Sequence, residues 1–157
     1  MTDREIVVGL ISDTHGLLRP QAIDALRGSE LIIHAGDIGK PEVIHQLRAI
    51  APTFAVRGNV DSQAWAADFP ATEAVEIGQV IVWVLHDIAQ LDLDPVAAGF
   101  AAVVFGHSHQ PSIETRDGVL YINPGSAGPR RFKLPVTVAR VSVTGRAIRP
   151  EIINLEF

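Results

Sequence analysis

Cysteine is absent from this 157-residue chain, and that absence excludes thiolate-bound zinc, iron–sulfur clusters and thiol catalysis. Positive charge is scarce, because 13 basic residues face 18 acidic ones and the formal net charge is −5. That balance argues against a generic nucleic-acid or anionic-membrane surface. No apolar run approaches the ~18 residues that a membrane helix needs, and no apolar leader opens the sequence. We therefore expect a cytoplasmic protein.

Three common nucleotide-binding and hydrolase motifs are also missing. No Gly-x-Gly-x-x-Gly follows the first predicted strand, and Gly39-Lys40 is followed by Pro41 rather than by Ser or Thr. The sequence around Ser126 fails the Gly-x-Ser-x-Gly pattern of a serine hydrolase because position 124 is proline. The chain is long enough to bury ~70% of its unfolded surface, so residues 1–157 are expected to fold as one domain without disulfides.

The N-terminal half alternates strands with helices. Continuous apolar runs at 6–11, 31–33 and 53–56 predict strands that are buried on both faces. Pro20 and Pro41 each open a segment with helical spacing of apolar residues. This β-α-β-α-β order predicts parallel strands joined by right-handed crossovers.

The second half is richer in strands. Residues 74–77 and 80–85 predict a hairpin, and a short helical stretch covers 95–98. Another buried strand is expected at 101–105, and two further strand pairs at 112–115 with 119–122 and at 136–143 with 147–155. We therefore expect two packed mixed sheets with helices outside them.

Metal-capable side chains follow five of the predicted strands, usually beside a glycine. Ligands of open α/β sheets bind at the carboxyl ends of strands, so these side chains are expected around one crevice. Residues i and i+2 of extended backbone point to the same side, which lets each Asp-x-His or His-x-His pair face one centre. The seven candidates are Asp13, His15, Asp37, Asn59, His86, His107 and His109.

Seven donors are too many for one catalytic ion, which typically takes three protein ligands. They suit two ions ~3.5–4 Å apart with one carboxylate bridging them. The mixture of nitrogen and oxygen donors favours Mn²⁺, Zn²⁺, Fe or Ni²⁺ over Mg²⁺ and Ca²⁺, which prefer oxygen alone. Each motif is weak by itself, and the prediction depends on their order at successive strand ends.

The other two histidines are expected to play no such part. His45 falls opposite the apolar stripe of its helix and should face solvent. His34 lies inside a buried strand, where a hydrogen-bonded core residue is the simpler interpretation, or at most a partner that orients a ligand.

With these residues in view, the chain resembles the calcineurin-like metallophosphoesterases, and most closely their small single-domain phosphodiesterases. The motifs that carry the resemblance are Asp13-x-His15, Gly36-Asp37, Gly58-Asn59-x-Asp61, His86, and Gly106-His107-Ser108-His109. Asn123-Pro124-Gly125-Ser126 followed by Pro129-Arg130 is also typical of that branch.

The resemblance implies a four-layer α/β/β/α sandwich and a binuclear metal centre. It implies that Asp13, His15 and His109 hold one ion and that Asn59, His86 and His107 hold the other. Asp37 would bridge the two ions, and Mn²⁺ is the metal expected first.

Two positions depart from the family pattern. Val60 stands where many members carry a histidine that acts as an acid or a phosphate ligand, so efficient hydrolysis of alkyl monoesters is not expected. Asp87 stands where glycine usually follows His86, and it adds negative charge near the second ion. Its effect, tighter metal binding or obstruction of substrate, is open at this point.

The predicted activity is hydrolysis of a phosphodiester P–O bond by a metal-bridging hydroxide, since two dications can lower the pKa of water to about 7. Asn59 and Arg130 are the predicted substrate contacts, Arg57 is a further candidate, and Asp61 is expected to orient the Asn59 loop. The alternative is a non-catalytic metal-binding scaffold in a protein complex, like a trafficking-complex subunit of the same fold. Physiological substrate and oligomeric state stay open, and a homo-oligomer is compatible with the apolar strands.

Overall fold

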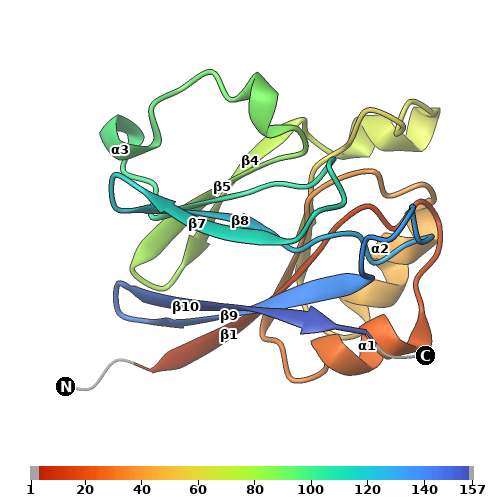
Figure 1. The fold of residues 1–157 in the computed structure, drawn as a ribbon, viewed down its shortest axis with the longest axis horizontal. Coiled ribbons are helices and arrows are strands. Elements are labelled where there is room, and N and C mark those ends of the chain that lie inside the picture. Colours follow the sequence, from red (N-terminus) through yellow and green to blue (C-terminus); the bar gives the residue numbers. More distant parts are fainter. Residues whose placement is uncertain (1–3, 156–157) are drawn as a thin grey trace.

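Two five-stranded mixed sheets, packed face to face, form the centre of the structure (Figure 1). The computed structural model describes residues 4–155, so the first three and last two residues of the predicted domain lie outside the described part. The first sheet has the order β10-β9-β1-β2-β3. Its strands are β1 (Glu5–Ile11), β2 (Leu31–His34), β3 (Thr53–Ala55), β9 (Thr137–Thr144) and β10 (Ala147–Asn154).

The second sheet has the order β4-β5-β6-β8-β7. Its strands are β4 (Thr72–Ile77), β5 (Val80–Leu85), β6 (Ala102–Val104), β7 (Ser112–Arg116) and β8 (Val119–Asn123). Within it β5, β6 and β8 run parallel, whereas β4 and β7 pair antiparallel at the two edges. In the first sheet β1, β2 and β3 are parallel, as the β-α-β-α-β order predicted.

The helices cover the outer faces of the two sheets. Two α-helices, α1 (Pro20–Leu26) and α2 (Pro41–Arg48), begin at the prolines that predicted them, and each proline lies in the first turn. The second sheet is covered only by the segment that carries α3 (Pro95–Ala98) and a 3₁₀ turn, η2 (Ile88–Gln90). A further 3₁₀ helix, η1 (Ala64–Asp68), precedes β4 and has too few residues to show a periodic pattern.

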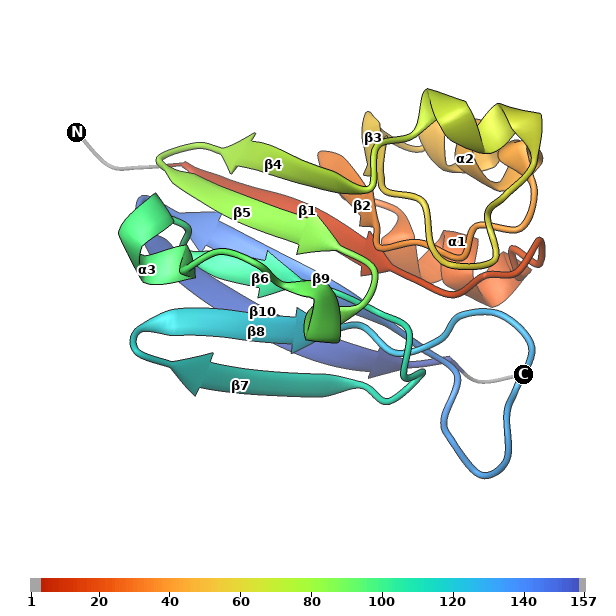
Figure 2. The ribbon, with the colours of Figure 1, turned by 90° about the horizontal axis from the view of Figure 1, so that it is seen from above.

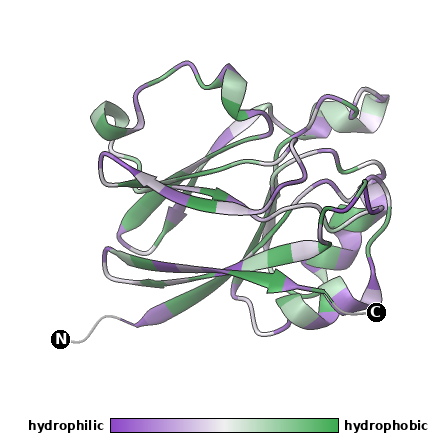
Figure 3. Cartoon of the chain, in the orientation of Figure 1, coloured by the Kyte–Doolittle hydropathy of each residue, from purple (hydrophilic) through white to green (hydrophobic). Residues whose placement is uncertain are grey.

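Three apolar layers confirm the predicted four-layer sandwich. Side chains of both sheets meet in the central layer, which includes Val8, Ile33, Val82 and Val104. The first sheet and its helices share a second layer around Leu26, Ile44 and Leu47. The third layer is the smallest, because only Leu85, Val103 and Val119 are fully buried beneath the α3 segment. Figure 3 shows that hydrophobic stretches run along the strands of both sheets.

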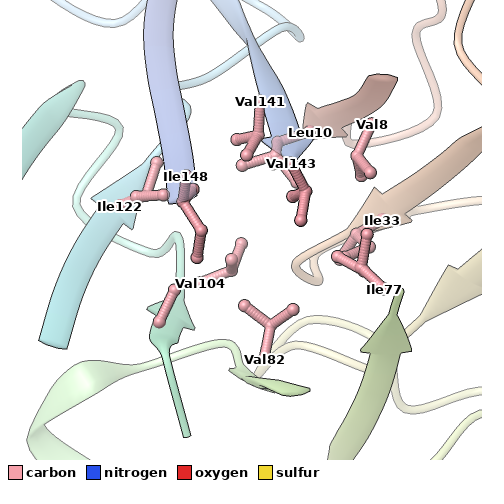
Figure 4. Close-up of a pocket in the computed structure, with 11 residues that line it drawn as sticks. Val8, Leu10, Ile33, Ile77, Val82, Val104, Ile122, Val141, Val143 and Ile148 are labelled. Carbon is pink, nitrogen blue, oxygen red and sulfur yellow. The ribbon is translucent and has the colours of Figure 1, made fainter. Parts of the chain in front are cut away.

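The central layer leaves almost no free space between the sheets. Figure 4 shows Val82, Val104 and Ile122 of one sheet pointing toward Val141 and Val143 of the other. The void among them measures about 10 Å³, about the room of one water molecule, and no polar atom lines it. The interior therefore offers no ligand site. None of the helices within residues 4–155 is long and apolar enough to cross a membrane.

Candidate metal centre

Both sheets direct the carboxyl ends of their parallel strands to the same edge of the molecule (Figure 2). The loops after β1, β2 and β3 belong to the first sheet, and those after β5, β6 and β8 to the second. All seven candidate ligands lie on these loops. The sandwich therefore brings together side chains that are as far apart in sequence as Asp13 and His109.

Backbone hydrogen bonds continue the strand pairing into these loops and fix them to one another. The amides of Asp13 and His15 donate to the carbonyl oxygens of Gly36 and Asp37, over 3.0 and 2.9 Å. The Gly106 amide donates to the His86 carbonyl over 2.9 Å, which joins two loops of the second sheet. The His107 amide donates to Asp13 Oδ2 over 3.2 Å and connects the two sheets.

The backbone at the candidate ligands is strained. Five of the seven have positive φ angles, in the left-handed region that non-glycine residues rarely adopt. Such conformations persist only where the surrounding structure enforces them, and they are concentrated at functional sites. The residues are Asp13, His15, Asp37, His107 and His109, with φ between 47° and 73°.

Two clusters of donor atoms converge, each with its ligand atoms within 4.8 Å of one another. The first joins Asp13, His15 and His109, with 3.4 Å between His109 Nε2 and Asp13 Oδ1. The second joins Asp13, Asp37 and His86. Asp37 Oδ2 lies 3.7 Å from His15 Nε2 and 3.2 Å from His86 Nε2, so it stands within reach of both clusters.

His107 and Asn59 lie at the open edge of the clusters. The His107 ring packs edge-on against the His86 ring at 5.2 Å, and its side chain is 46% exposed. Asn59 is exposed and lines a groove of about 270 Å³ together with Arg57, His86 and Asp87. The structure thus brings five of the seven candidates into close clusters and leaves these two beside them, with Asn59 on the wall of the groove and His107 against the His86 ring.

Four buried donor atoms in the clusters have no hydrogen-bond partner among the described residues: Asp13 Oδ1, His15 Nε2, His86 Nε2 and His109 Nδ1. Burial raises the pKa of the Asp13 carboxyl, and although the neighbouring histidines and Ser12 lower it, Asp37 adds to the rise. Unpaired buried polar atoms and an unfavourably buried carboxylate are both costly. A divalent cation would compensate both, so the residues present fit a metal site.

His86 is already oriented as a metal ligand would be. Its Nδ1 lies 2.8 Å from the Ala35 carbonyl, which can only accept a hydrogen bond, so Nδ1 carries the proton. That leaves Nε2, which lies 3.8 Å from Asp13 Oδ1 and 3.2 Å from Asp37 Oδ2, as the ring atom available to a metal ion. A backbone carbonyl that fixes the tautomer in this way is the usual companion of a metal-binding histidine.

Glycines make room for the clusters at two positions. A Cβ atom at Gly106 would lie 2.1 Å from Ser12 Oγ and 2.7 Å from Asp13 Oδ2. A Cβ atom at Gly58 would lie 2.1 Å from Asp37 Oδ1. These contacts are too short for any side chain, so the glycine of each Gly-His and Gly-Asn motif has a steric role.

Asp61 holds two loops together. Its carboxylate is buried and accepts hydrogen bonds from the amides of Ile38, Gly39 and Gly58, over 2.9 to 3.0 Å. These amides belong to the loops that carry Asp37 and Asn59. The contacts give Asp61 a positioning role.

The two histidines set aside above are placed as expected. His45 is exposed on α2. His34 is fully buried, and its Nδ1 accepts from the Gly36 amide while Nε2 lies 2.9 Å from Thr14 Oγ1. Burial lowers the pKa of His34 to about 3, so the ring stays neutral.

The arginines predicted to contact substrate differ in their surroundings. Arg57 lines the groove, and its guanidinium donates to the Phe69 carbonyl over 2.6 Å. Arg130 is exposed on the loop that follows Ser126.

Two supporting residues were not recognised from the sequence. Ser12 Oγ donates to Asp13 Oδ2 over 2.8 Å, and the Asn123 amide group donates to the Gly106 carbonyl and Ser108 Oγ, both over 3.1 Å. The position of Asn123 could have indicated its role, because it stands at the end of a buried strand as the candidate ligands do. Ser12 carried no signal beyond its place next to Asp13.

The family model of the calcineurin-like phosphoesterase superfamily domain matches residues 6–146, which covers the elements that form both clusters. The chain belongs to this superfamily. A probable metallophosphoesterase of Methanothermobacter thermautotrophicus is 33% identical over 161 residues, covering 95% of this chain and 92% of that protein. The superfamily acts on phosphoesters, which agrees with the convergent donor set.

Two solved structures extend the comparison. An archaeal phosphodiesterase is 25% identical, with a TM-score of 0.77 over 94% of this chain and all of that one. Vacuolar protein sorting 29 from Cryptosporidium parvum has a TM-score of 0.79 over 99% of this chain and all of that one, at 19% identity. The second likeness concerns the fold alone.

Proposed function

We propose that this chain is a phosphodiesterase that depends on two divalent metal ions. The observation that carries the proposal is the convergence of unpartnered buried donors in two clusters that share Asp13 and adjoin Asp37. The similarity to an archaeal phosphodiesterase supports the choice of diesters.

In this proposal Asp13, His15 and His109 hold one ion, and Asn59, His86 and His107 hold the other. Asp37 would bridge the two ions, and its Oδ2 atom lies within 4 Å of a histidine from each set. Mn²⁺ is the metal we propose first, with Zn²⁺, Fe and Ni²⁺ as alternatives that a mixed nitrogen and oxygen donor set also accepts. When bound, the two ions supply a Lewis acid that makes water acidic near neutral pH and offsets charge on phosphoryl oxygens.

The chain's own residues then determine which ester is accepted. The groove beside Asn59 and His86 admits the ester group of the substrate, and Arg57 lies on its wall. The backbone amide of Val60 donates a hydrogen bond to Asp37 Oδ1, but the Val60 side chain has no proton that it could give to a leaving group. A diester with a good leaving group, such as an aryl alcohol, suits this site better than an alkyl monoester.

The test is hydrolysis of bis(p-nitrophenyl) phosphate by protein that is first stripped with chelator and then titrated with Mn²⁺. We expect activity only with metal, and a high ratio of diester to monoester turnover. Asp37→Asn should reduce kcat/KM by more than about 100-fold, since even residues that merely orient ligands cost 10–100-fold. Asp24→Asn is the matched control, because that carboxylate is 73% exposed and paired with Arg27 on the surface.

Full activity of Asp37→Asn at saturating Mn²⁺ would contradict the bridging role. A preference for monoesters would contradict the interpretation of Val60. Tight metal binding without turnover on any phosphoester would favour the scaffold alternative. That alternative is supported only by a fold shared with vacuolar protein sorting 29.

A further inference from the structure

A basic loop with one exposed aromatic side chain projects between β8 and β9, and it plays no part in the metal clusters. Phe132 is 94% exposed, the most exposed large hydrophobic residue in the described part of the chain. Arg130, Arg131 and Lys133 flank it and are exposed as well. We call residues 129–134 the RRFK loop. Three cations within four residues contrast with a chain whose net charge is −5.

The RRFK loop is anchored next to the first cluster. Ser126 Oγ donates to the Asp13 carbonyl over 3.1 Å, and the Ala127 amide donates to the Ser12 carbonyl. On the return, Val136 pairs with Ser126, and the Leu134 amide donates to the Arg131 carbonyl within the loop. Figure 2 shows the start of this loop next to the one after β6, which carries His107 and His109, and shows its tip projecting outward.

The RRFK side of the site is basic, because Arg130, Arg131 and Lys133 are all exposed there. The groove on the side of Asn59 and His86 carries the carboxylates of Asp87 and Asp92 instead. A substrate with anionic groups beyond the reacting phosphate is therefore attracted to the RRFK side and repelled from the groove.

Phe132 is also held in an unusual conformation. Seven non-glycine residues of the described chain have positive φ: five are candidate metal ligands, Asp117 lies in a hairpin turn, and Phe132 has φ +53°. The left-handed region is unfavourable for a bulky residue, and exposing the ring to water adds to the disadvantage. A strained, exposed aromatic on a loop that is anchored next to the first cluster indicates a binding contact.

We infer that the RRFK loop binds a single-stranded nucleic acid, with Phe132 stacking on a base and the three cations facing neighbouring phosphates. This inference rests on the proposed phosphodiesterase function, because it takes one phosphodiester of that strand as the substrate. Stacking on an aromatic ring and ion pairing along the backbone are how proteins bind single strands without reading sequence. An anionic membrane fits less well, because the loop has three basic residues, whereas basic clusters that bind anionic lipids have about four to eight.

The test measures binding of a fluorescein-labelled phosphorothioate dT8, which resists hydrolysis, to the Mn²⁺-loaded protein by fluorescence anisotropy. Phe132→Ala should weaken binding about tenfold, since stacking is worth about 1–3 kcal/mol per base and 1.4 kcal/mol is tenfold. Phe132→Trp should retain it. The double variant Arg131→Gln/Lys133→Gln should lower the slope of log Kd against log salt by about 1.4. Arg48→Gln, on the exposed side of α2, is the control for loss of charge elsewhere.

Equal dT8 binding by wild type, Phe132→Ala and the double variant would overturn the inference. If Phe132→Ala leaves dT8 binding unchanged but reduces binding to phosphatidylserine vesicles, or reduces dimer formation in sedimentation, the inference is also overturned. Turnover of bis(p-nitrophenyl) phosphate by the wild type separates the two proposals. Turnover without dT8 binding removes only this inference. Binding of dT8 in the expected pattern without turnover of any phosphodiester removes the proposed function, and it leaves the strand as a bound ligand rather than a substrate.

Discussion

Asp61 offers a quantitative test of how the metal loops are held, because one carboxylate serves three backbone amides. Replacing it with alanine leaves the amides of Ile38, Gly39 and Gly58 without their acceptor. Ile38 is fully buried, so its amide bears a full desolvation penalty of about 1–3 kcal/mol. Gly39 and Gly58 are only half-buried, and water can replace part of what they lose.

Summed over the three amides, we expect Asp61→Ala to lower the free energy of unfolding by about 3 kcal/mol. For a chain of this length, that corresponds to a fall in Tm of about 6–12 °C. Because the same amides position Asp37 and Asn59, Mn²⁺ affinity should fall about 10–100-fold. Thermal unfolding in chelator and isothermal titration with Mn²⁺ measure the two effects separately.

Two further variants make this test specific. Asp61→Asn retains one acceptor oxygen and should recover about half of the lost stability, whereas Asp24→Asn on the surface should change Tm by little. If Asp61→Ala abolished turnover while Tm and Mn²⁺ affinity stayed at wild-type values, Asp61 would act in proton transfer, and the positioning role argued here would be wrong.

Three other changes test separate parts of the site. Gly106→Ala places a Cβ 2.1 Å from Ser12 Oγ and should abolish Mn²⁺ binding in calorimetry. Gly28→Ala should bind Mn²⁺ normally, because a Cβ at Gly28 has nothing within 4 Å. Normal binding by both variants would refute the steric role. His34, with a folded pKa of about 3 and an ordinary value near 6.5 when unfolded, contributes stability that is complete above pH 6.5 and is lost on acidification. Between pH 7.5 and pH 5, the free energy of urea unfolding should therefore fall by about 2 kcal/mol more in metal-free wild type than in His34→Gln. His45→Gln should behave as wild type, and equal losses in all three proteins would contradict this. Val60→His should raise monoester turnover relative to diester turnover about tenfold or more, by supplying an acid to the leaving group, and an unchanged ratio would count against that role.

The sequence predicted most of the fold because its strands are short apolar runs bounded by glycine, proline or polar residues. The helix starts at Pro20 and Pro41 and the short helix at Pro95–Ala98 were expected and are present. The parallel pairing of β5, β6 and β8 was not foreseen, because the link from β5 to β6 has only a four-residue helix and the link from β6 to β8 is itself a strand, β7. The 3₁₀ turns η1 and η2 were not predicted because they are too short to show a periodic pattern.

The site shows a similar division between what a sequence reveals and what it does not. Motif order placed the candidate ligands at strand ends, where the structure has them. The sequence could not show that five of them adopt left-handed backbone angles, nor that Asn59 lines an open groove and His107 is half exposed. Those properties depend on how loops from two sheets meet. Phe132 and Arg131 went unnoticed because only the fold brings their loop beside Asp13 and His109.

The convergence of the candidate ligands on two cations is the claim on which the rest depends. A crystal of this protein grown with Mn²⁺ and measured at the manganese absorption edge tests it directly. We expect two anomalous peaks about 3.5–4 Å apart, both within bonding distance of the Asp37 carboxylate. A single peak, or peaks away from Asp13, Asp37 and the four candidate histidines, would contradict the account.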